Sequence, residues 1–229
     1  MIARSGVRVV DLAQELGPAT AVWPGMHRLS ARIEATYADD GAYAREITLN
    51  EHTGTHFDAP AHFHEGGETV EGVPASQLVC EAAVIDVREA CQKDHDYRVT
   101  AADVLGNERA HGPIAPGMAV LVMTGWSSFL HESGRYVEDL HFPGYGVEAA
   151  RLLVERGVIG IGIDTLSIDA GIAGESPVHH IVLPAGMWAL EGLVQLDHLP
   201  PRGALLVVGA PRLVAGSGVP ARPLALLPA

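Results

Sequence analysis

Residues 146–164 read Gly-Val-Glu-Ala-Ala-Arg-Leu-Leu-Val-Glu-Arg-Gly-Val-Ile-Gly-Ile-Gly-Ile-Asp, a helix pattern that runs directly into a strand pattern. Apolar side chains recur along one side of residues 146–155, and Gly157 suits the end of a helix. The run 158–164 is almost continuously apolar, which is typical of a strand buried on both faces in a sheet covered by helices. This stretch therefore predicts the helix–strand unit of an α/β fold.

The same signals recur on both sides of this unit. Residues 82–87 and 119–124 are almost continuously apolar and predict two more strands buried on both faces, while shorter runs predict strands at 7–11, 45–49 and 204–209. Thr100 is a typical N-cap for a short helix that ends before Gly106. The 26 Gly and 15 Pro indicate short elements joined by tight turns. We therefore expect an α/β fold with a mixed sheet and short helices, in a single domain spanning residues 1–229.

Composition and charge exclude several classes of function. Hydrophobic residues make up 48% and charged residues 19% of the 229 residues, which is the balance of a folded globular protein. The formal net charge of −13 repels phosphate backbones, so nucleic acid is not an expected partner. No apolar run approaches the ~18 residues of a membrane span. Neither Cys80 nor Cys91 belongs to a CxxC pair, and no signal-peptide core precedes Asp11, so we expect a cytoplasmic protein.

Four potential metal ligands or catalytic groups fall within eleven residues, in the run His52-Thr-Gly-Thr-His56-Phe-Asp58-Ala-Pro-Ala-His62. The intervening Thr-Gly-Thr is a poor helix segment, so the two-histidine helix face of HExxH metalloproteases does not apply. In an extended conformation His52, His56 and Asp58 would project from the same side. Pro60 then breaks regular structure, so His62 can reach the same site from a turn. Two imidazoles and a carboxylate can form an open metal site, whereas the alternative is a loop of surface histidines.

This run resembles the HxGTHxDxPxH signature of the putative cyclase family, which comprises metal-dependent hydrolases such as bacterial kynurenine formamidase and isatin hydrolase. Similar segments extend from about residue 9 to residue 224, at 10–12, 22–25, 121–126, 160–169 and 177–193. The resemblance implies a mixed sheet of the swivelling β/β/α type and a homo-oligomer, either a dimer or a tetramer. It also implies a divalent metal cofactor, one or two Zn²⁺ or Mn²⁺ ions.

Carried over position by position, the resemblance implies five metal ligands: His52, His56, Asp58, His179 and Glu191. Asp58 would be able to bridge two ions. His180 is an alternative to His179, although the spacing to Glu191 favours His179. The chemistry agrees, because borderline metals accept imidazole and carboxylate ligands. His62 matches the family's catalytic histidine.

Three further features have competing explanations. Trp23 is a candidate substrate-binding residue, but Trp-Pro-Gly is equally suited to packing and to a turn. Asp164 and Asp169 are candidates to hold a ligand imidazole, although Asp164 at a strand end would equally cap a turn. The role of the segment Gly216-Ser-Gly218 stays open.

The ligand set predicts hydrolysis by a metal-activated water, in which His62 moves a proton from the attacking water to the leaving nitrogen. The expected small-molecule substrate is an amide, formamide or lactam, as in arylformamidase or isatin hydrolase activity, and a lactone or other cyclic ester is the alternative. Thr55 and Phe57 depart from the formamidase branch of the family, which favours Ala at both positions. Two rival interpretations are a non-haem iron oxygenase with a two-histidine, one-carboxylate triad, and a metal-binding module without catalysis.

Overall fold

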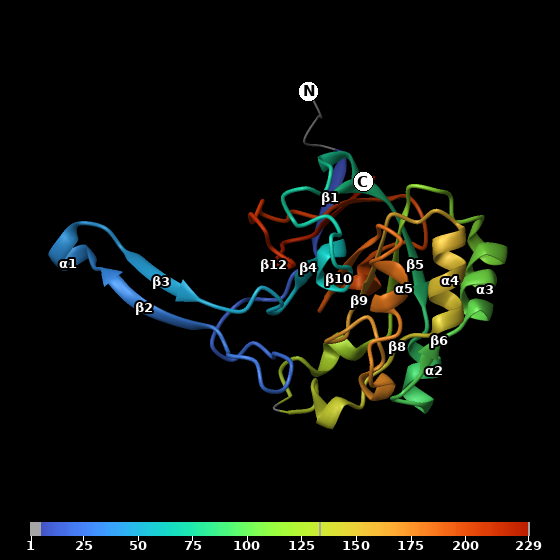
Figure 1. Cartoon of the computed structure of the whole chain (residues 1–229), viewed down its shortest axis with the longest axis horizontal. Coiled ribbons are helices and arrows are strands. Elements are labelled where there is room, and N and C mark those ends of the chain that lie inside the picture. The colour runs from blue at the N-terminus through green and yellow to red at the C-terminus, as the bar shows by residue number, and fades with distance from the viewer. Residues whose placement is uncertain (1–5, 133, 229) are drawn as a thin grey trace.

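In the computed structural model, which describes residues 6–132 and 134–228, the apolar runs form the centre of a nine-stranded mixed sheet (Figure 1). From one edge to the other, its strands are β1 (Val7–Asp11), β13 (Leu224–Pro228), β11 (Ala204–Val207), β5 (Val79–Asp86), β7 (Ala119–Met123), β9 (Gly160–Ile163), β10 (Trp188–Glu191), β4 (His56–Asp58) and β12 (Gly218–Pro220). Strands β5, β7, β9 and β10 are parallel to one another, and the remaining pairs are antiparallel. The predicted α/β fold with a mixed sheet is confirmed.

Short helices connect and cover these strands: α1 (Tyr37–Asp40), α2 (Arg88–Lys93), α3 (Ala101–His111), α4 (Val147–Glu155) and α5 (His179–Val182). The predicted helix–strand unit is present as α4 and β9, and Gly157 follows the helix in the left-handed conformation, with φ 70°. In the described part of the chain, none of the helices combines the length and apolar character needed to cross a bilayer.

Helix α3 begins where the sequence predicts but ends later. Thr100 and Asp103 form a reciprocal capping box at its start. The expectation that this helix ends before Gly106 is wrong, because it continues to His111. A glycine inside a helix costs only about 1 kcal/mol relative to alanine. Beyond Gly106, Asn107 donates to the carbonyl oxygen of Val84 and Glu108 forms an ion pair with Arg156, and these contacts compensate for that cost.

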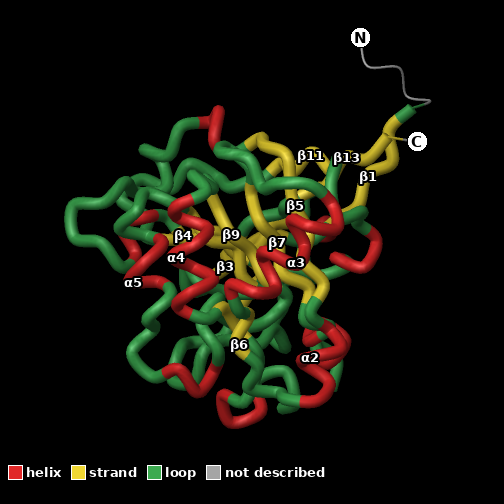
Figure 2. Tube along the Cα trace, turned by 90° about the vertical axis from the view of Figure 1, so that its right-hand side faces the viewer, coloured by secondary structure: helices red, strands yellow, loops and turns green. Residues whose placement is uncertain are grey.

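Side chains alternate across the sheet into two apolar layers. On β5, Ala82 and Val84 enter one layer, whereas Ala83 and Ile85 enter the other. The second layer lies beneath helices α3, α4 and α5, which Figure 2 shows in front of the sheet. Burial on both faces is the physical reason that the central strands are apolar almost without interruption.

Two further strand pairs lie outside the main sheet. β6 (Arg98–Val99) and β8 (Gly144–Tyr145) form a short parallel pair. β2 (Ser30–Ala35) and β3 (Ala44–Thr48) form a hairpin, here called the arm, which projects away from the body of the molecule (Figure 1). The predicted strand at 45–49 is therefore present, but it belongs to the arm and not to the main sheet.

Candidate metal centre

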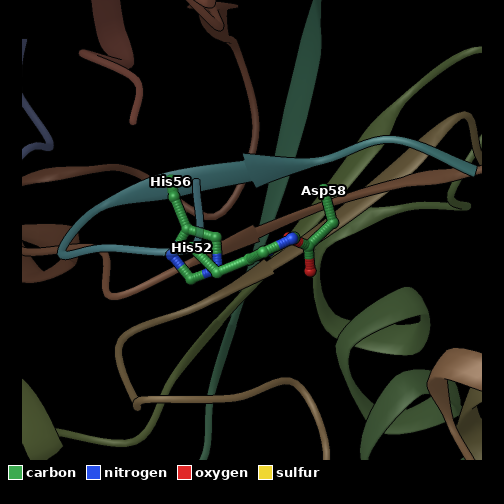
Figure 3. A group of neighbouring side chains, drawn as sticks. All are labelled: His52, His56 and Asp58. Carbon is green, nitrogen blue, oxygen red and sulfur yellow. The ribbon is translucent and has the colours of Figure 1, made fainter. Parts of the chain in front are cut away.

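The histidine-rich run folds as a loop, a strand and a turn. β4 contains only His56–Asp58, and its two end residues project from the same side (Figure 3), while Phe57 packs into the core against Trp188. The prediction that His52 belongs to the same extended segment is wrong. Gly54 adopts a left-handed φ of 67° and turns the chain, so His52 approaches from the preceding loop. The alternation of side chains along a strand therefore places His56 and Asp58 on the same side, but it does not position His52.

Asp58 lies at the centre of the cluster and is fully buried. Its Oδ1 is 2.7 Å from Nδ1 of His52 and 3.4 Å from Nε2 of His56. Its Oδ2 is 3.5 Å from Nε2 of His179. The two oxygens of one carboxylate thus face different imidazoles, which is the arrangement that a bridging carboxylate requires.

Glu191 supplies a second buried carboxylate from the end of β10, directly opposite His56 in the antiparallel pair of β10 and β4. Its Oε2 is 3.2 Å from Nε2 of His56, and its Oε1 is 3.2 Å from Nε2 of His179. His179, at the start of α5, is buried in the cluster, whereas His180 is exposed. The structure therefore brings His179 to the cluster and leaves His180 outside it.

Two of the imidazoles are oriented by acceptors behind them. Nδ1 of His56 lies 2.9 Å from the carbonyl oxygen of Gly54, and Nδ1 of His179 lies 2.6 Å from Oδ2 of Asp169. Both acceptors lack a proton, so each Nδ1 must be the donor, and each Nε2 is left as the atom that can bind a cation. Asp169 therefore holds an imidazole, one of the roles considered for it from the sequence.

Charges within the cluster are strongly interdependent. Burial disfavours a charged imidazole, but the carboxylates of Asp58 and Glu191 outweigh it and raise the pKa of His56 to about 10. Despite burial, the hydrogen bond that His179 donates to Asp169, together with the nearby carboxylates of Asp58 and Glu191, raises the pKa of His179 well above its ordinary value. Burial and the charge of Asp58 oppose ionisation of Glu191, yet the neighbouring histidines lower its pKa to about 2. Two buried carboxylates therefore demand positive charge, either as protons on the histidines or as a cation.

Metal binding should consequently release protons. His56 and His179 both hold an extra proton at neutral pH in the metal-free cluster, because their pKa values are raised, and each must lose it to become a ligand. We expect about two protons to be released for each cluster that is filled at pH 7, and metal affinity to weaken as the pH falls. Isothermal titration calorimetry in buffers of different ionisation enthalpy measures this number. A binding enthalpy that is independent of the buffer would contradict it.

The donor set fits one or two divalent cations. The ligand atoms of His52, His56 and Asp58 all lie within 4.8 Å of one another. Oδ2 of Asp58 is buried without a hydrogen-bond partner among the described residues, an arrangement that is costly unless a cation neutralises it. Imidazole nitrogens and carboxylate oxygens are ligands that Zn²⁺ and Mn²⁺ both accept.

His62 reaches the cluster from the 3-10 turn Pro60–His62, in agreement with the role of Pro60 predicted from the sequence. Its ring stacks on that of His52, with centroids 3.9 Å apart. Burial lowers the pKa of His62 to about 4, so its imidazole is neutral at neutral pH. Nitrogen atoms of His62 and His179 and an oxygen of Asp58 also lie within 4.8 Å of one another. A neutral imidazole at this position is able to accept a proton from a water molecule bound in the cluster.

The structure also places two other positions singled out from the sequence, Trp23 and Asp164. Trp23 is partly buried and makes an edge contact with Phe142, 6.4 Å between ring centroids, in a third apolar cluster. Within the described part of the chain, the indole of Trp23 makes an aromatic ring contact with Phe142 and none with a candidate ligand. Asp164 accepts hydrogen bonds from the backbone N–H groups of Thr124 and Gly125, which matches the turn-capping explanation.

Sequence reasoning missed the residues that hold His52. Nε2 of His52 lies 3.0 Å from Oγ of Ser217, and that hydroxyl lies 2.9 Å from Oε2 of Glu51. Gly218 lies against the His52 ring, where a Cβ would overlap it. The segment Gly216-Ser-Gly218 stands out in the sequence but indicates no role there, and Glu51 is distinguished only by its position beside His52.

The chain is similar to known proteins over most of its length. A model of the putative cyclase family matches residues 10–170, a segment that contains the run from His52 to His62. The chain is 30% identical to isatin hydrolase of Roseibium aggregatum over 97% of this chain and 92% of that protein. It is 27% identical to kynurenine formamidase of Salinibacter ruber, over 93% of this chain and 95% of the relative.

The likeness extends to solved structures. A crystal structure of an isatin hydrolase bound to the product analogue thioisatinate superposes with a TM-score of 0.92 and 28% identity, and it covers 97% of this chain and 93% of that one. The match spans almost the whole of both chains, so the two proteins share the complete fold.

Proposed function

Because this chain belongs to the putative cyclase family, we propose that the cluster centred on Asp58 is the active site of a metal-dependent hydrolase. The chain is a hydrolase that acts on carbon–nitrogen bonds other than peptide bonds, in a small amide, formamide or lactam. One observation supports the site above all: two buried carboxylates are shared among three imidazoles, and Oδ2 of Asp58 has no hydrogen-bond partner within residues 6–132 and 134–228. The whole chain, residues 1–229, would act as one catalytic domain.

The proposed ligands form two overlapping sets around one or two Zn²⁺ or Mn²⁺ ions: His52, His56 and Asp58 in one, and Asp58, His179 and Glu191 in the other. A divalent cation here supplies Lewis acidity toward a water molecule and toward the substrate carbonyl. The protein fixes the orientation of the imidazole rings and keeps the carboxylates ionised, so the centre is preorganised before the substrate binds.

His62 is the proposed proton carrier. The neutral imidazole accepts one proton as a water oxygen forms a bond to the substrate carbonyl carbon. The resulting imidazolium then donates that proton to the leaving nitrogen as the carbon–nitrogen bond breaks. His62 ends the cycle neutral, and hydrolysis leaves a carboxylic acid and an amine, which belong to one ring-opened molecule when the substrate is a lactam.

The proposed substrate carries its amide or lactam on an aromatic ring, in keeping with the relatives named above. The two positions that depart from the formamidase branch do not argue against either relative's chemistry. Phe57 packs against Trp188 in the core, and Oγ1 of Thr55 donates to the carbonyl oxygen of Gly192. Both side chains are therefore engaged within the fold, Phe57 by packing and Thr55 by a hydrogen bond.

Turnover after metal exchange tests this function. The purified protein is analysed for bound metals and then assayed with isatin, N-formylkynurenine and a small panel of lactones. Parallel samples are stripped with a chelator and reloaded with Zn²⁺ or Mn²⁺. We expect turnover of an aromatic lactam or formamide that disappears on stripping and returns on reloading. A protein that binds no metal even after reloading would refute the proposed site.

We also propose that the chain forms a homo-oligomer, with the arm packed against a second copy. Arg32 and Glu46 form an ion pair of 2.8 Å on one face of the arm, and the opposite face exposes Ile33 and Ile47 at 56% and 50%. An isolated two-stranded hairpin is at best marginally stable in water, and the two exposed isoleucines, which share their face with Arg45, favour burial against a second copy.

Charged substitutions on that face should therefore separate the copies. The double variant Ile33→Glu/Ile47→Glu is expected to reduce the molar mass measured by multi-angle light scattering to that of one chain. Arg32→Gln, on the charged face, is the control and should keep the assembly. A wild-type protein that is already monomeric would contradict the oligomer.

Location in the cytoplasm is a further proposal. Cys80 and Cys91 are free and buried, and burial raises their pKa values to about 11 and about 12. Unpaired, unreactive thiols are typical of proteins that function in a reducing compartment.

A further inference from the structure

The two ring nitrogens of His52 face different kinds of neighbour. Nδ1 points into the cluster, 2.7 Å from Oδ1 of Asp58, and Nε2 points away from it, 3.0 Å from Oγ of Ser217. This orientation is the reverse of that of His56 and His179, which direct Nε2 into the cluster. His52 would therefore bind a cation through Nδ1, whereas the other two histidines would use Nε2.

A chain of hydrogen bonds behind His52 determines where its proton lies. Oγ of Ser217 is 2.9 Å from Oε2 of Glu51, and the same oxygen accepts the backbone N–H groups of Ser217 and Gly218 at 2.9 and 3.2 Å. A carboxylate oxygen only accepts, so the single hydroxyl proton of Ser217 must lie between Ser217 and Glu51. If that proton pointed to His52 instead, two oxygen lone pairs would face each other at 2.9 Å. Ser217 consequently accepts from His52, and Nε2 of His52 carries a proton.

We propose that Glu51 is a positioning residue which, through Ser217, fixes the proton of His52 on Nε2 and so makes Nδ1 the metal-binding atom. This inference rests on the proposed function, because it assigns the binding atom of one ligand in the same centre. It assigns His52 the kind of outer partner that Gly54 and Asp169 provide for the other two histidines.

Packing keeps the His52 ring from rotating and exchanging the positions of Nδ1 and Nε2. One face of the His52 ring stacks on His62 at 3.9 Å, and the other lies so close to Gly218 that a Cβ there would overlap the ring atoms. A ring covered on both faces cannot readily rotate to exchange its two nitrogens. The orientation of the ring and the position of its proton are therefore set by separate parts of the structure.

The first test identifies the nitrogen bound to the metal. Protein labelled with ¹⁵N-histidine is loaded with Zn²⁺, which is diamagnetic, and long-range ¹H–¹⁵N spectra assign the bound nitrogen of each ring. We expect His52 to bind through Nδ1, and His56 and His179 through Nε2. Binding of His52 through Nε2 would overturn the inference while leaving the proposed metal site intact. Failure of the wild-type protein to bind Zn²⁺ would overturn both.

The second test measures Zn²⁺ affinity in variants of the chain behind His52. Glu51→Ala frees the Ser217 hydroxyl to donate to His52, which moves the histidine proton to Nδ1, where the cation must bind. We expect a loss of affinity of about 10–100-fold, the usual effect of removing an outer partner. Adding Ser217→Ala to Glu51→Ala removes the competing donor and should recover part of this loss. Glu51→Gln keeps an acceptor oxygen, so its loss should be smaller than that of Glu51→Ala.

Glu71 provides the matched control. Its Oε1 accepts the backbone N–H of Ala215, so it holds the same C-terminal loop without touching His52. If Glu51 only orders this loop, Glu71→Ala should lose as much affinity as Glu51→Ala, and adding Ser217→Ala to Glu51→Ala should weaken binding further. Either result would overturn the inference. Near wild-type affinity in Glu71→Ala, together with partial recovery in the double variant, would support it.

Discussion

Replacing His62 with Ala is expected to lower kcat about 10²–10⁴-fold, the usual contribution of general acid–base catalysis, and to leave the metal content unchanged. This loss corresponds to about 3–5 kcal/mol of transition-state stabilisation. The physical reason is that burial holds the pKa of His62 at about 4, so the neutral ring beside the cluster accepts a proton at any pH above that value. Activity of the wild-type protein should therefore not fall through protonation of His62 until the pH approaches 4. Steady-state kinetics with metal analysis of the same sample measures both quantities.

Metal content separates this role from direct ligation. Nitrogen atoms of His62 and His179 and an oxygen of Asp58 lie within 4.8 Å of one another, so the geometry allows His62 to contact a cation. If His62 is a ligand, His62→Ala should lose metal and activity in parallel. His64→Ala is the matched control, because His64 is an exposed imidazole two residues further along the chain and should keep both. Loss of metal in His62→Ala would contradict the proton-carrier role.

The central sheet could be predicted from sequence because its physical requirement is simple. Strands covered on both faces must be apolar at consecutive positions, and β7, with all five residues buried, shows this pattern. The end of α3 could not be predicted in the same way. Local propensity favours a helix end near Gly106, whereas tertiary contacts of Asn107 with Val84 and of Glu108 with Arg156 continue the helix to His111. Propensities of about 1 kcal/mol decide element bounds only where packing is indifferent.

In the candidate site, too, local features could be predicted from the sequence and long-range contacts could not. The run from His52 to His62 is local, so its ligand types and their spacing were visible in the sequence. The partners behind the ligands are not local: Asp169 lies beyond β9, and Ser217 lies 165 residues from His52. The pairing of β10 with β9 and β4, and of β4 with β12, brings these segments together. The choice of Nδ1 or Nε2 as the binding atom therefore belongs to the tertiary structure and has no signature in the motif.

The largest effect is expected for Asp58→Asn, which should abolish both metal binding and turnover. The two oxygens of Asp58 face His52 and His56 on one side and His179 on the other, so one substitution affects both ligand sets. Asparagine has nearly the same shape, but it carries no charge and offers only one acceptor atom. Its NH₂ group would also point a donor at a nitrogen that must bind the cation. Loss of the charge should in addition lower the pKa of His56, because Asp58 is the principal group that raises it.

Metal analysis, activity and proton release together measure these consequences. Asp58→Asn should contain no metal after reloading and should show only background hydrolysis, and addition of Zn²⁺ should release no protons. Asp164→Asn is the matched control, because Asp164 is also a fully buried carboxylate but caps the turn at Thr124 and lies outside the cluster. That variant should be less stable by about 1.5–3 kcal/mol, the usual cost of a lost hydrogen bond to a charged group, and should still bind metal. Full metal content in Asp58→Asn would show that Asp58 is not a ligand, and the bridging arrangement would have to be abandoned.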